Sequence, residues 1–561
     1  MIRMNKIAVF FFLISVVFAA QAQNLHVAVD GSDDTGDGTI ENPYATITEA
    51  SRYIQPGDTV FVHQGTYHNA HFGDGDIWKR EGLATIKCDG AEDAVIVFMP
   101  FPGDSVTLEF DANHGVLIRR SSYVKFAGFV IKGIGDQITK EQVEDAWGLY
   151  KDSLGVVHDL AQEMGIDITD PDLLGQTLDK PETVGIQKPS YYNGSGLVAL
   201  LSHHIILENN TIMWAVASGL RVQKSDYTTV VGNKIYYNTY RTSAGVGALT
   251  VAETQVLPEG DAFDGVKIKI IRNEVYQNEN QIYSWAPSKS FIHFVIDEGS
   301  GIFLTRNNDT YDHGYMLIAN NLSWLNGASG IVVHKTDRVY VEHNTVYDNG
   351  TTNGETAKPG GIGFNTTNDV TIRNNISWSK PNKFALGKVG GTNNNLVIDS
   401  NLLFNNYGAQ SVVKNVNSGW FEANPQFVDV DNFDFHLRSN SSAIDRGFYP
   451  VMVTDDFAGN PRDSKPDIGA YEYDSAVSVI NNDVKGRELL TAFPNPATGM
   501  VYINSVADIS GRPTLYDVAG KTVKVRIEKF GNNRIRLDVT TLLPGIYFLN
   551  TNSGTVKIVK R

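Results

Sequence analysis

Cysteine is almost absent from this chain, because Cys88 is the single one among 561 residues. One thiol excludes an intramolecular disulfide, and it also excludes zinc sites that are built from several thiolates. Positive charge is scarce too: 47 Lys and Arg residues face 63 Asp and Glu residues, for a net charge of −16. Nucleic-acid binding needs a basic surface, so we expect no nucleic-acid partner. After residue 20, no apolar run is long enough to cross a membrane.

The first residues have the pattern of a secretory signal peptide. Arg3 and Lys6 precede an apolar run over residues 7–18, and small residues at Ala20 and Ala22 offer a cleavage site. The apolar run is too short to anchor the chain in a bilayer. We therefore expect residues 1–22 to be a signal peptide and the mature chain to be a secreted, soluble monomer.

One short phrase recurs along the middle of the chain. It consists of an asparagine, a variable residue, a small or branched apolar residue and, in most copies, an aromatic residue. The steps between copies are 23, 40, 48, 23, 31 and 26 residues, which indicates a basic repeat of ~20–25 residues lengthened by insertions. Repeats of this size cannot bury an apolar face alone, so they must stack into a solenoid. The copies begin at Asn210, Asn233, Asn273, Asn321, Asn344, Asn375 and Asn401.

The short apolar runs between these phrases, such as residues 115–118 and 196–201, are typical of buried parallel strands. Asparagine tolerates a left-handed backbone, and its amide can bond to the same asparagine one coil away, so we expect an asparagine ladder at one turn. We expect the aromatic residues of the phrase to stack inside the solenoid. The prediction is an all-β parallel β-helix with coils from about residue 95 to about residue 427.

One segment interrupts the repeat. Between Thr139 and Met164 the apolar residues have helical spacing, and Thr139 with Gln142 fits a capping box. We expect a helical insertion over residues 136–190 that leaves the solenoid wall between two coils. Such an insertion either builds one side of a binding cleft or is a packing decoration, and the sequence leaves both readings open.

Four coils align on a glycine, at Gly219, Gly301, Gly330 and Gly361. The sixth residues from the glycine are then Lys224, Arg306, Lys335 and Thr366. Adjacent coils lie ~4.8 Å apart, so aligned residues form a column, and we expect Arg306 beside Lys335 with His334 next to them. The structural alternative is that these are solvated turn residues paired with neighbouring Asp226 and Asp337.

A cationic column beside carboxylates suits β-elimination on an acidic sugar chain. This reaction needs a group that neutralises the uronate carboxylate, a base that removes the C5 proton and a donor for the leaving oxygen. We predict Lys335 and His334 as base and acid, and Arg306 as the carboxylate clamp, because its fork matches a carboxylate. The predicted substrate-binding residues are Lys224, Arg221 and His313. The predicted ligands for a Ca²⁺ ion, if one is bound, are Asp297, Glu298 and Asp264.

Two ends of the solenoid and its coil pattern resemble known proteins. Residues 26–48, with a Gly/Asp loop and a short amphipathic stretch, resemble the N-terminal cap of bacterial right-handed parallel β-helix proteins. Residues 424–428, 442–445 and 467–472 resemble the segment that closes such solenoids. The coils resemble the pectate-lyase-like superfamily, which includes pectate, alginate and chondroitin lyases, mannuronan epimerases and some glycoside hydrolases. The phrase at residues 299–304 lacks the lysine that some calcium-dependent pectate lyases carry there.

The C-terminal residues carry a second resemblance. Turn residues separate short alternating strands, with Pro-Asn-Pro at 494–496 and a basic end at Lys560 and Arg561. This pattern resembles the C-terminal sorting domain of the type IX secretion system of Bacteroidetes. The resemblance implies export across the outer membrane, removal of the tail, and release or attachment at the cell surface. We therefore predict a β-helix with its insertion (23–473), a linker (474–487) and a small β-sandwich sorting domain (488–561).

Three functions follow from these observations. The first is a secreted lyase that cleaves a uronate-containing polysaccharide by β-elimination. The second is a glycoside hydrolase on the same fold, which needs two carboxylates at a fixed gap. The third is a non-catalytic surface protein that binds carbohydrate. The hydrolase would draw its carboxylates from Asp261, Asp264, Asp297 and Glu298.

Overall fold

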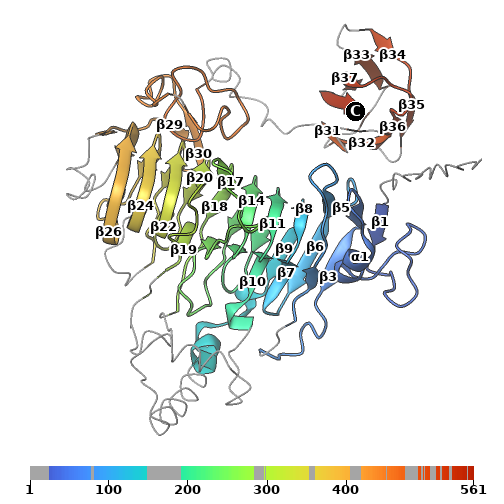
Figure 1. Cartoon of the computed structure of the whole chain (residues 1–561), viewed down its shortest axis with the longest axis horizontal. Coiled ribbons are helices and arrows are strands. Elements are labelled where there is room, and N and C mark those ends of the chain that lie inside the picture. The colour runs from blue at the N-terminus through green and yellow to red at the C-terminus, as the bar shows by residue number, and fades with distance from the viewer. Residues whose placement is uncertain are drawn as a thin grey trace, which may run out of the picture.

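The computed structural model describes residues 24–77, 81–147, 191–282, 296, 298–352, 360–404, 419–449, 451–473 and most of 490–560. The expected signal peptide and linker lie outside these residues, as does 148–190 of the insertion. Up to residue 422 the strands form three long parallel faces that stack as rungs along one axis (Figure 1). The chain passes through the first, second and third face in turn and then returns to the first, one rung further on. The predicted all-β parallel β-helix is therefore confirmed.

Three sets of strands make the faces, and β22, β24 and β26 run through the first and second faces without a break. The first face contains β4 (Ala84–Ile86), β7 (His114–Arg119), β10 (Ser195–Leu200), β13 (Leu220–Gln223), β16 (Leu249–Ala252), β19 (Ile302–Asn307), β22 (Ile331–Glu342), β24 (Ile362–Arg373) and β26 (Leu386–Asp399). The second face starts with β1 (Asn24–Val27), β2 (Thr59–Val62), β5 (Ile96–Pro100), β8 (Ser122–Ala127), β11 (His203–Glu208), β14 (Asp226–Val231), β17 (Val266–Ile271) and β20 (Tyr315–Ala319). The third face contains β3 (Gly65–His68), β6 (Val106–Phe110), β9 (Val130–Gly133), β12 (Thr211–Met213), β15 (Lys234–Tyr236), β18 (Glu274–Tyr276), β21 (Leu322–Trp324), β23 (Thr345–Tyr347), β25 (Ile376–Trp378), β27 (Asn401–Phe404) and β28 (Trp420–Glu422). The rungs thus begin at β1, well before residue 95.

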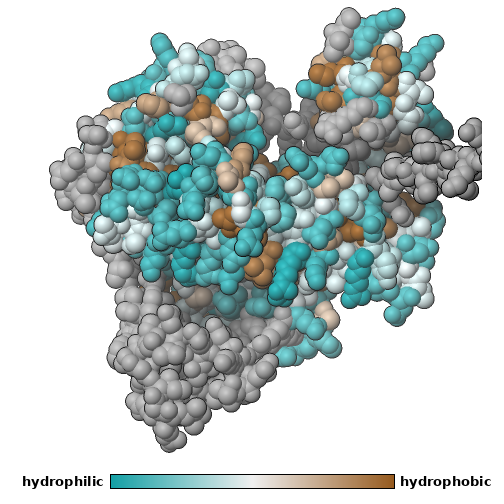
Figure 2. Space-filling model, viewed as in Figure 1, coloured by the Kyte–Doolittle hydropathy of each residue, from teal (hydrophilic) through white to brown (hydrophobic). Residues whose placement is uncertain are grey.

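Alternating side chains point into and out of the solenoid, as the period of two in a strand requires. In β19, Ile302 and Leu304 are fully buried, and they lie in register with Ile331 and Val333 of the next rung. Burying such a side chain contributes about 1.5–3 kcal/mol, so the stacked aliphatic columns hold the rungs together. The view in Figure 2 shows the complementary result, a surface that is hydrophilic over most of its described residues.

The predicted asparagine ladder is confirmed at the turn between the second and third faces. Each buried asparagine donates from Nδ2 to Oδ1 of the equivalent asparagine on the next rung, at 2.9–3.1 Å, from Asn210 to Asn401. The same Oδ1 atoms also accept the backbone N–H of the asparagine on the rung before. Buried polar groups at this turn are therefore satisfied by their own repeat.

A second ladder, which the sequence analysis did not identify, lies at the turn between the third and first faces. Its members are bonded in the same way at 2.8–3.1 Å. They lie five residues after members of the first ladder and repeat its spacing. The second ladder consists of Asn238, Asn278, Asn326 and Asn349.

The aromatic residues of the repeated phrase do stack, but the prediction that they lie inside is wrong. Tyr276 and Trp324 are parallel with ring centroids 4.3 Å apart, and Tyr236 continues the stack at 4.9 Å. Val275, one residue before Tyr276, is fully buried in the core. Since neighbouring residues in a strand point to opposite sides, Tyr276 must point outward.

A segment after the last rung covers part of this outer aromatic stack. The hairpin of β29 (Phe427–Asp429) and β30 (Asp434–Leu437) places Phe427 and Phe435 in one buried cluster with Trp324. Residues 442–473 then run back along the side of the middle rungs. The guanidinium of Arg462 donates to Asn320 Oδ1 at 2.8 Å, and His343 Nδ1 lies 3.1 Å from the carbonyl of Asp467. The segment predicted to close the solenoid thus packs along its side.

The described parts of the N-terminal cap and of the insertion agree with the expected elements. Helix α1 (Ile47–Tyr53) starts at Thr46, whose hydroxyl accepts the N–H of Glu49, and packs on β4 at the N-terminal end. Residues 140–147 of the insertion are helical, and the capping box between Thr139 and Gln142 is present. Short 3₁₀ turns, η1 (Gly135–Gln137) and η2 (Tyr191–Asn193), flank the insertion.

After residue 489 the chain forms a separate pair of antiparallel sheets with its own buried core. One sheet has the order β31 (Leu490–Phe493), β32 (Met500–Ser505), β36 (Arg534–Asp538), β35 (Arg526–Lys529). The other has the order β34 (Thr522–Val523), β33 (Thr514–Asp517), β37 (Gly545–Thr551), β38 (Gly554–Lys560).

Candidate functional site

Most of the predicted site residues gather at the corner between the first and second faces, here called the first corner. The chain turns there through one residue in the left-handed conformation on each rung, with φ of 49° at Lys224, 55° at Arg306 and 43° at Lys335. Strands β19 and β22 pair Thr305 with His334 and Asn307 with Thr336. The structure therefore brings Arg306 and Lys335 together on neighbouring rungs, as predicted.

The expected continuous column of cations is wrong, because the alignment on glycine skipped one rung. Strand β16 lies between β13 and β19, and its corner residue Glu253 separates Lys224 from Arg306. Glu253 accepts from Arg306 Nε at 2.9 Å and from Gln223 at 3.0 Å, and Lys224 lies 4.0 Å away. Burial raises the pKa of Glu253, but these hydrogen bonds and charges outweigh it and leave the pKa lowered. The rung has Ala248 where the aligned coils have glycine, so the glycine pattern could not reveal it.

Around Arg306 and Lys335 the first face supplies polar and aromatic side chains. His334 Nδ1 lies 2.9 Å from the hydroxyl of Thr305, and its ring is parallel to that of Phe303 at 5.9 Å. Lys335 is exposed, and the side chain of Arg306 is 52% exposed. This pair of cations, one rung apart and open to solvent, is the part of the predicted centre that can meet a ligand.

Arg221 lies on the outer side of the first face and is more enclosed than the sequence suggested. Its Nε is buried and has no hydrogen-bond partner among the described residues. Burial lowers the pKa of Arg221, the charge of Arg306 lowers it further, and Glu253 opposes both. Because Nε has almost no exposed surface, this donor is not open to a ligand, and Arg221 contributes its positive charge to the first corner.

The proposed pairing of Lys224 and Lys335 with Asp226 and Asp337 is wrong. Asp226 is fully buried and faces Lys267, whose Nζ lies 3.8 Å from it. Asp337 accepts the backbone N–H groups of Asp309 and Asn368, at 3.1 and 2.9 Å. Both carboxylates thus fix backbone turns at the first corner.

A buried charge cluster, which sequence reasoning missed, lies beside the exposed cations. The side chain of Lys267 has no exposed surface, and its Nζ donates to Asp261 at 2.5 Å. The rings of Tyr227 and Tyr311 lie 5.2 and 5.0 Å from the same nitrogen. Hydrogen bonds from Lys267 and from the Tyr227 hydroxyl hold the pKa of Asp261 below its usual range. A lysine in the alternating pattern of β17 gives no sequence signal of this burial.

Hydrogen bonds to Asp226 of this cluster attach two long loops to the solenoid. Asp226 accepts the backbone N–H of Leu257, at 3.0 Å, from the loop over residues 253–265. It also accepts the hydroxyl of Tyr311, at 2.8 Å, from the loop over residues 307–314. Both loops protrude at the first corner from the rungs that carry Glu253 and Arg306. The buried Asp226 therefore holds in place the two loops that lie beside the exposed Arg306 and Lys335.

The predicted calcium ligands do not come together in the described part of the chain. Asp264 Oδ1 accepts the N–H of Gly314 at 3.0 Å and faces Arg338 at 3.4 Å, and Glu298 lies 3.5 Å from the Ser300 hydroxyl. Asp297 lies outside the described residues. No group of three or more His, Cys, Asp or Glu side chains that could hold a metal ion occurs among the described residues. The calcium prediction therefore stays a prediction.

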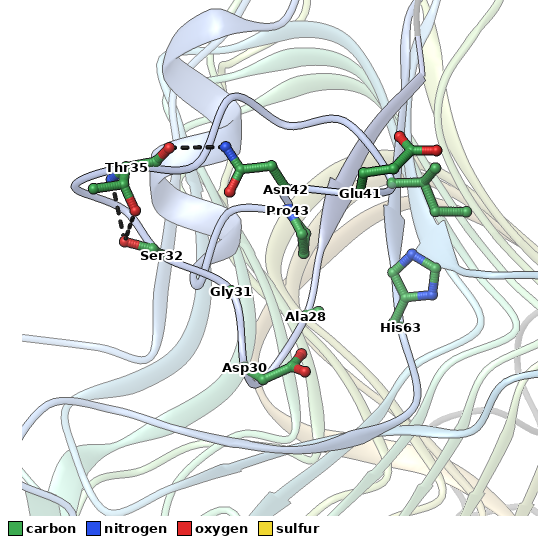
Figure 3. Close-up of a pocket in the computed structure, with 10 residues that line it drawn as sticks. Ala28, Asp30, Gly31, Ser32, Thr35, Glu41, Asn42, Pro43 and His63 are labelled. Atoms are coloured by element: carbon green, nitrogen blue, oxygen red, sulfur yellow. Dashed lines mark hydrogen bonds between the residues drawn. The ribbon is translucent and has the colours of Figure 1, made fainter.

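His313 and the pocket at the N-terminal cap give less evidence for a functional site. His313 is exposed on the loop over residues 307–314. A polar pocket of about 500 Å³ lies at the N-terminal cap, where Asp30, Glu41 and His63 line it together with the turn at Ser32 (Figure 3). No predicted site residue belongs to this pocket. No helix in the described ranges is long and apolar enough to cross a membrane.

Comparison with known proteins defines the class. Residues 491–561 match the family model of a secretion system C-terminal sorting domain, which confirms the predicted sorting domain. The chain is thus a parallel β-helix protein that carries a type IX secretion signal, which indicates secretion and, in many such proteins, attachment to the outer-membrane surface.

The wider comparisons are distant. No match was found among curated proteins. The solved structures that resemble the chain include pectate lyase Pel9A, with 15% identity, a TM-score of 0.44, and coverage of 81% of this chain and 97% of the other. A rhamnogalacturonan lyase matches with 11% identity, a TM-score of 0.35 and coverage of 82% and 98%. The GH136 lacto-N-biosidase from Eubacterium ramulus matches with 12% identity, a TM-score of 0.34 and coverage of 68% and 56%.

Proposed function

We propose that this protein acts on a uronate-containing polysaccharide and cleaves it by β-elimination. The observation that carries the proposal is the exposed pair of Arg306 and Lys335 on neighbouring rungs, with His334 beside them. Rungs repeat every ~4.8 Å along the axis, which is close to the length of one sugar in an extended chain. A polymer that lies along the first corner would therefore present one carboxylate after another to these cations.

The proposed roles follow from the chemistry of elimination. A cation next to the uronate carboxylate makes the C5 proton more acidic, a base removes that proton, the C4–O bond breaks, and C4 and C5 become doubly bonded. The leaving oxygen takes a proton from an acid. Arg306 would bind the carboxylate through the guanidinium nitrogens that Glu253 does not use, and the positive charge of the enclosed Arg221 would add to the attraction. Lys335 would act as the base and His334 as the acid.

The other two functions have less support. A hydrolase needs two carboxylates that flank the bond, yet Asp261 is bound by Lys267 and Tyr227, and Asp264 faces Arg338. A binding protein without activity would use the same cations but form no new product. No step of the proposed elimination depends on a metal ion.

The test is an incubation of the full-length protein with polygalacturonate, alginate and a neutral glycan, each with and without a chelator. Elimination gives the ultraviolet absorbance of an unsaturated uronate, and hydrolysis gives reducing ends without that absorbance. Lys335→Ala should lower the rate by roughly 10²–10⁴-fold, the contribution of a general base. Lys269→Ala, which removes an exposed lysine from the second face, is the matched control and should not change the rate. Full activity of Lys335→Ala would show that another residue is the base.

A further inference from the structure

One large aromatic side chain at the first corner is left open to solvent. Phe263, in the loop over residues 253–265, is 52% exposed. Its ring lies against the backbone of Gly265, so close that a Cβ atom at Gly265 would overlap ring carbons Cζ and Cε1. The ring therefore rests on the glycine, and much of its surface still faces solvent.

The ring is also the exposed end of an aromatic column. Tyr123, His204 and Tyr227 stack along the second face with centroid distances of 4.3 and 4.4 Å, and the Phe263 ring lies 6.0 Å from Tyr227, tilted by 43° to it. The column starts at β8 and reaches the loops beside the candidate centre. These three rings lie on the N-terminal side of Phe263, on successive rungs.

Three carboxylates hold the loop that carries Phe263, and each of them pairs with a different cation. Glu253 at its start binds Arg306, Asp261 near its tip binds the buried Lys267, and Asp264 faces Arg338, three residues after Lys335. A side chain on such a loop is held in one place before a ligand arrives, which lowers the entropy lost on binding.

We propose that Phe263 is a stacking plate for a pyranose ring of the polysaccharide bound at the first corner. This inference rests on the proposed function, because it assumes that the polymer lies along Arg306 and Lys335. An aromatic face matches the C–H groups on one side of a pyranose, and the charged residues around it match the hydroxyl and carboxylate groups at the rim of the sugar. A protein partner would need a wider apolar patch, whereas Phe263 follows Asp261 by two residues and directly precedes Asp264 in the loop.

The structure offers two independent ways to remove the plate. Phe263→Ala deletes the ring, and Gly265→Ala leaves it in the chain but displaces it, because the new methyl group occupies its resting place. Gly265 does not have a left-handed φ, and the atoms that the methyl group meets are the far end of one side chain. The glycine variant should therefore fold normally, which the unfolding midpoint measured by tryptophan fluorescence checks.

The experiment is affinity electrophoresis of the full-length protein in native gels that contain polygalacturonate or alginate. Both variants should bind about 3–10-fold more weakly, the range expected for one aromatic contact. The double variant should be no weaker than either single one, and Phe263→Trp should keep the affinity. The control is Tyr53→Ala in helix α1, which removes an aromatic side chain with 55% exposure at the N-terminal end.

The outcomes separate the two proposals. Unchanged affinity of both variants, or an equal loss in Tyr53→Ala, overturns the stacking plate, while elimination that still depends on Lys335 leaves the proposed function standing. Weaker binding of both variants without any unsaturated product supports the plate and overturns the lyase. Failure of the wild-type protein to bind either polymer overturns both.

Discussion

The buried charge cluster makes a prediction that can be worked out from its contacts. Lys267→Met keeps the length of the side chain and removes its charge, so that Asp226 stays fully buried without its cation. Breaking a buried ion pair in this way costs about 3–5 kcal/mol of stability. Asp226 still accepts three hydrogen bonds, from Tyr311, Leu257 and its own neighbour Tyr227. Asp261 is 19% exposed and can be hydrated. We therefore expect a loss near the lower limit, about 3 kcal/mol.

Urea unfolding followed by tryptophan fluorescence is a suitable assay. All 7 tryptophans precede residue 474, so the signal reports on the solenoid and not on the sorting domain. Adding Asp226→Asn to Lys267→Met removes the buried, unpaired charge of Asp226 and should restore part of the free energy of unfolding. The coupling between the two substitutions should be about 1–3 kcal/mol, as for residues in direct contact.

Two results would refute this reasoning. A Lys267→Met variant within about 0.5 kcal/mol of the wild type would show that the charge pair contributes nothing net, since that is the usual effect of a neutral surface substitution. Strict additivity of Lys267→Met and Asp226→Asn would show that the two residues do not act on each other. In either case the ion pair between Lys267 and Asp226 could not be what stabilises this corner, and only the hydrogen bonds of Asp226 to Leu257 and Tyr311 would hold the two loops.

Two further predictions concern the ladder and the loop. Asn273→Ala removes the amide that donates to the buried carbonyl of Val230 and the oxygen that accepts from the buried Nδ2 of Asn233, so the unfolding free energy should fall by at least about 1–3 kcal/mol. Urea titration measures it, and an equal loss for the exposed Asn394→Ala would contradict the ladder argument. The lowered pKa of Asp261 means that its ion pair stabilises the protein at neutral pH and is lost as the pH falls through that lowered pKa. The stability gap between the wild type and Asp261→Asn should accordingly stay constant near neutrality and narrow in acid, and a gap that widens in acid would be evidence against the pair.

The sequence predicted the parts of the fold that repeat. Asparagine at a fixed place in each coil has a physical reason, so Asn210 to Asn401 could be aligned. The register of Arg306 with Lys335 followed from a separate alignment, of Gly301 with Gly330. The second ladder was readable by the same logic, since Asn238, Asn278 and Asn326 repeat the steps of Asn233, Asn273 and Asn321. The sequence could also have predicted the orientation of Tyr276, because a residue next to an inward-facing valine in a strand must face outward.

The candidate site was less accessible, because it consists of departures from the repeat. The rung with Glu253 carries the asparagine phrase at Asn273, but it has Ala248 where the aligned coils have glycine, so the glycine alignment skipped its strand on the first face and strand pairing reveals it. Tyr311 reaches Asp226 across 85 residues of sequence, which no local pattern encodes. Lys267 occupies a position where an exposed lysine would fit equally well, and its burial depends on two loops whose paths are set by tertiary contacts.

The segment after the last rung has a mechanical consequence. Residues 442–473 are bonded to Asn320, His343 and Asn374, which lie on three successive rungs, and the chain leaves this segment toward the sorting domain. If removal of the tail is followed by attachment at the cell surface, the protein would be pulled at the C-terminal end of this segment. The segment is bonded to three rungs, so the pull would be shared among bonds on several rungs. The terminal rung would not be peeled away one bond at a time.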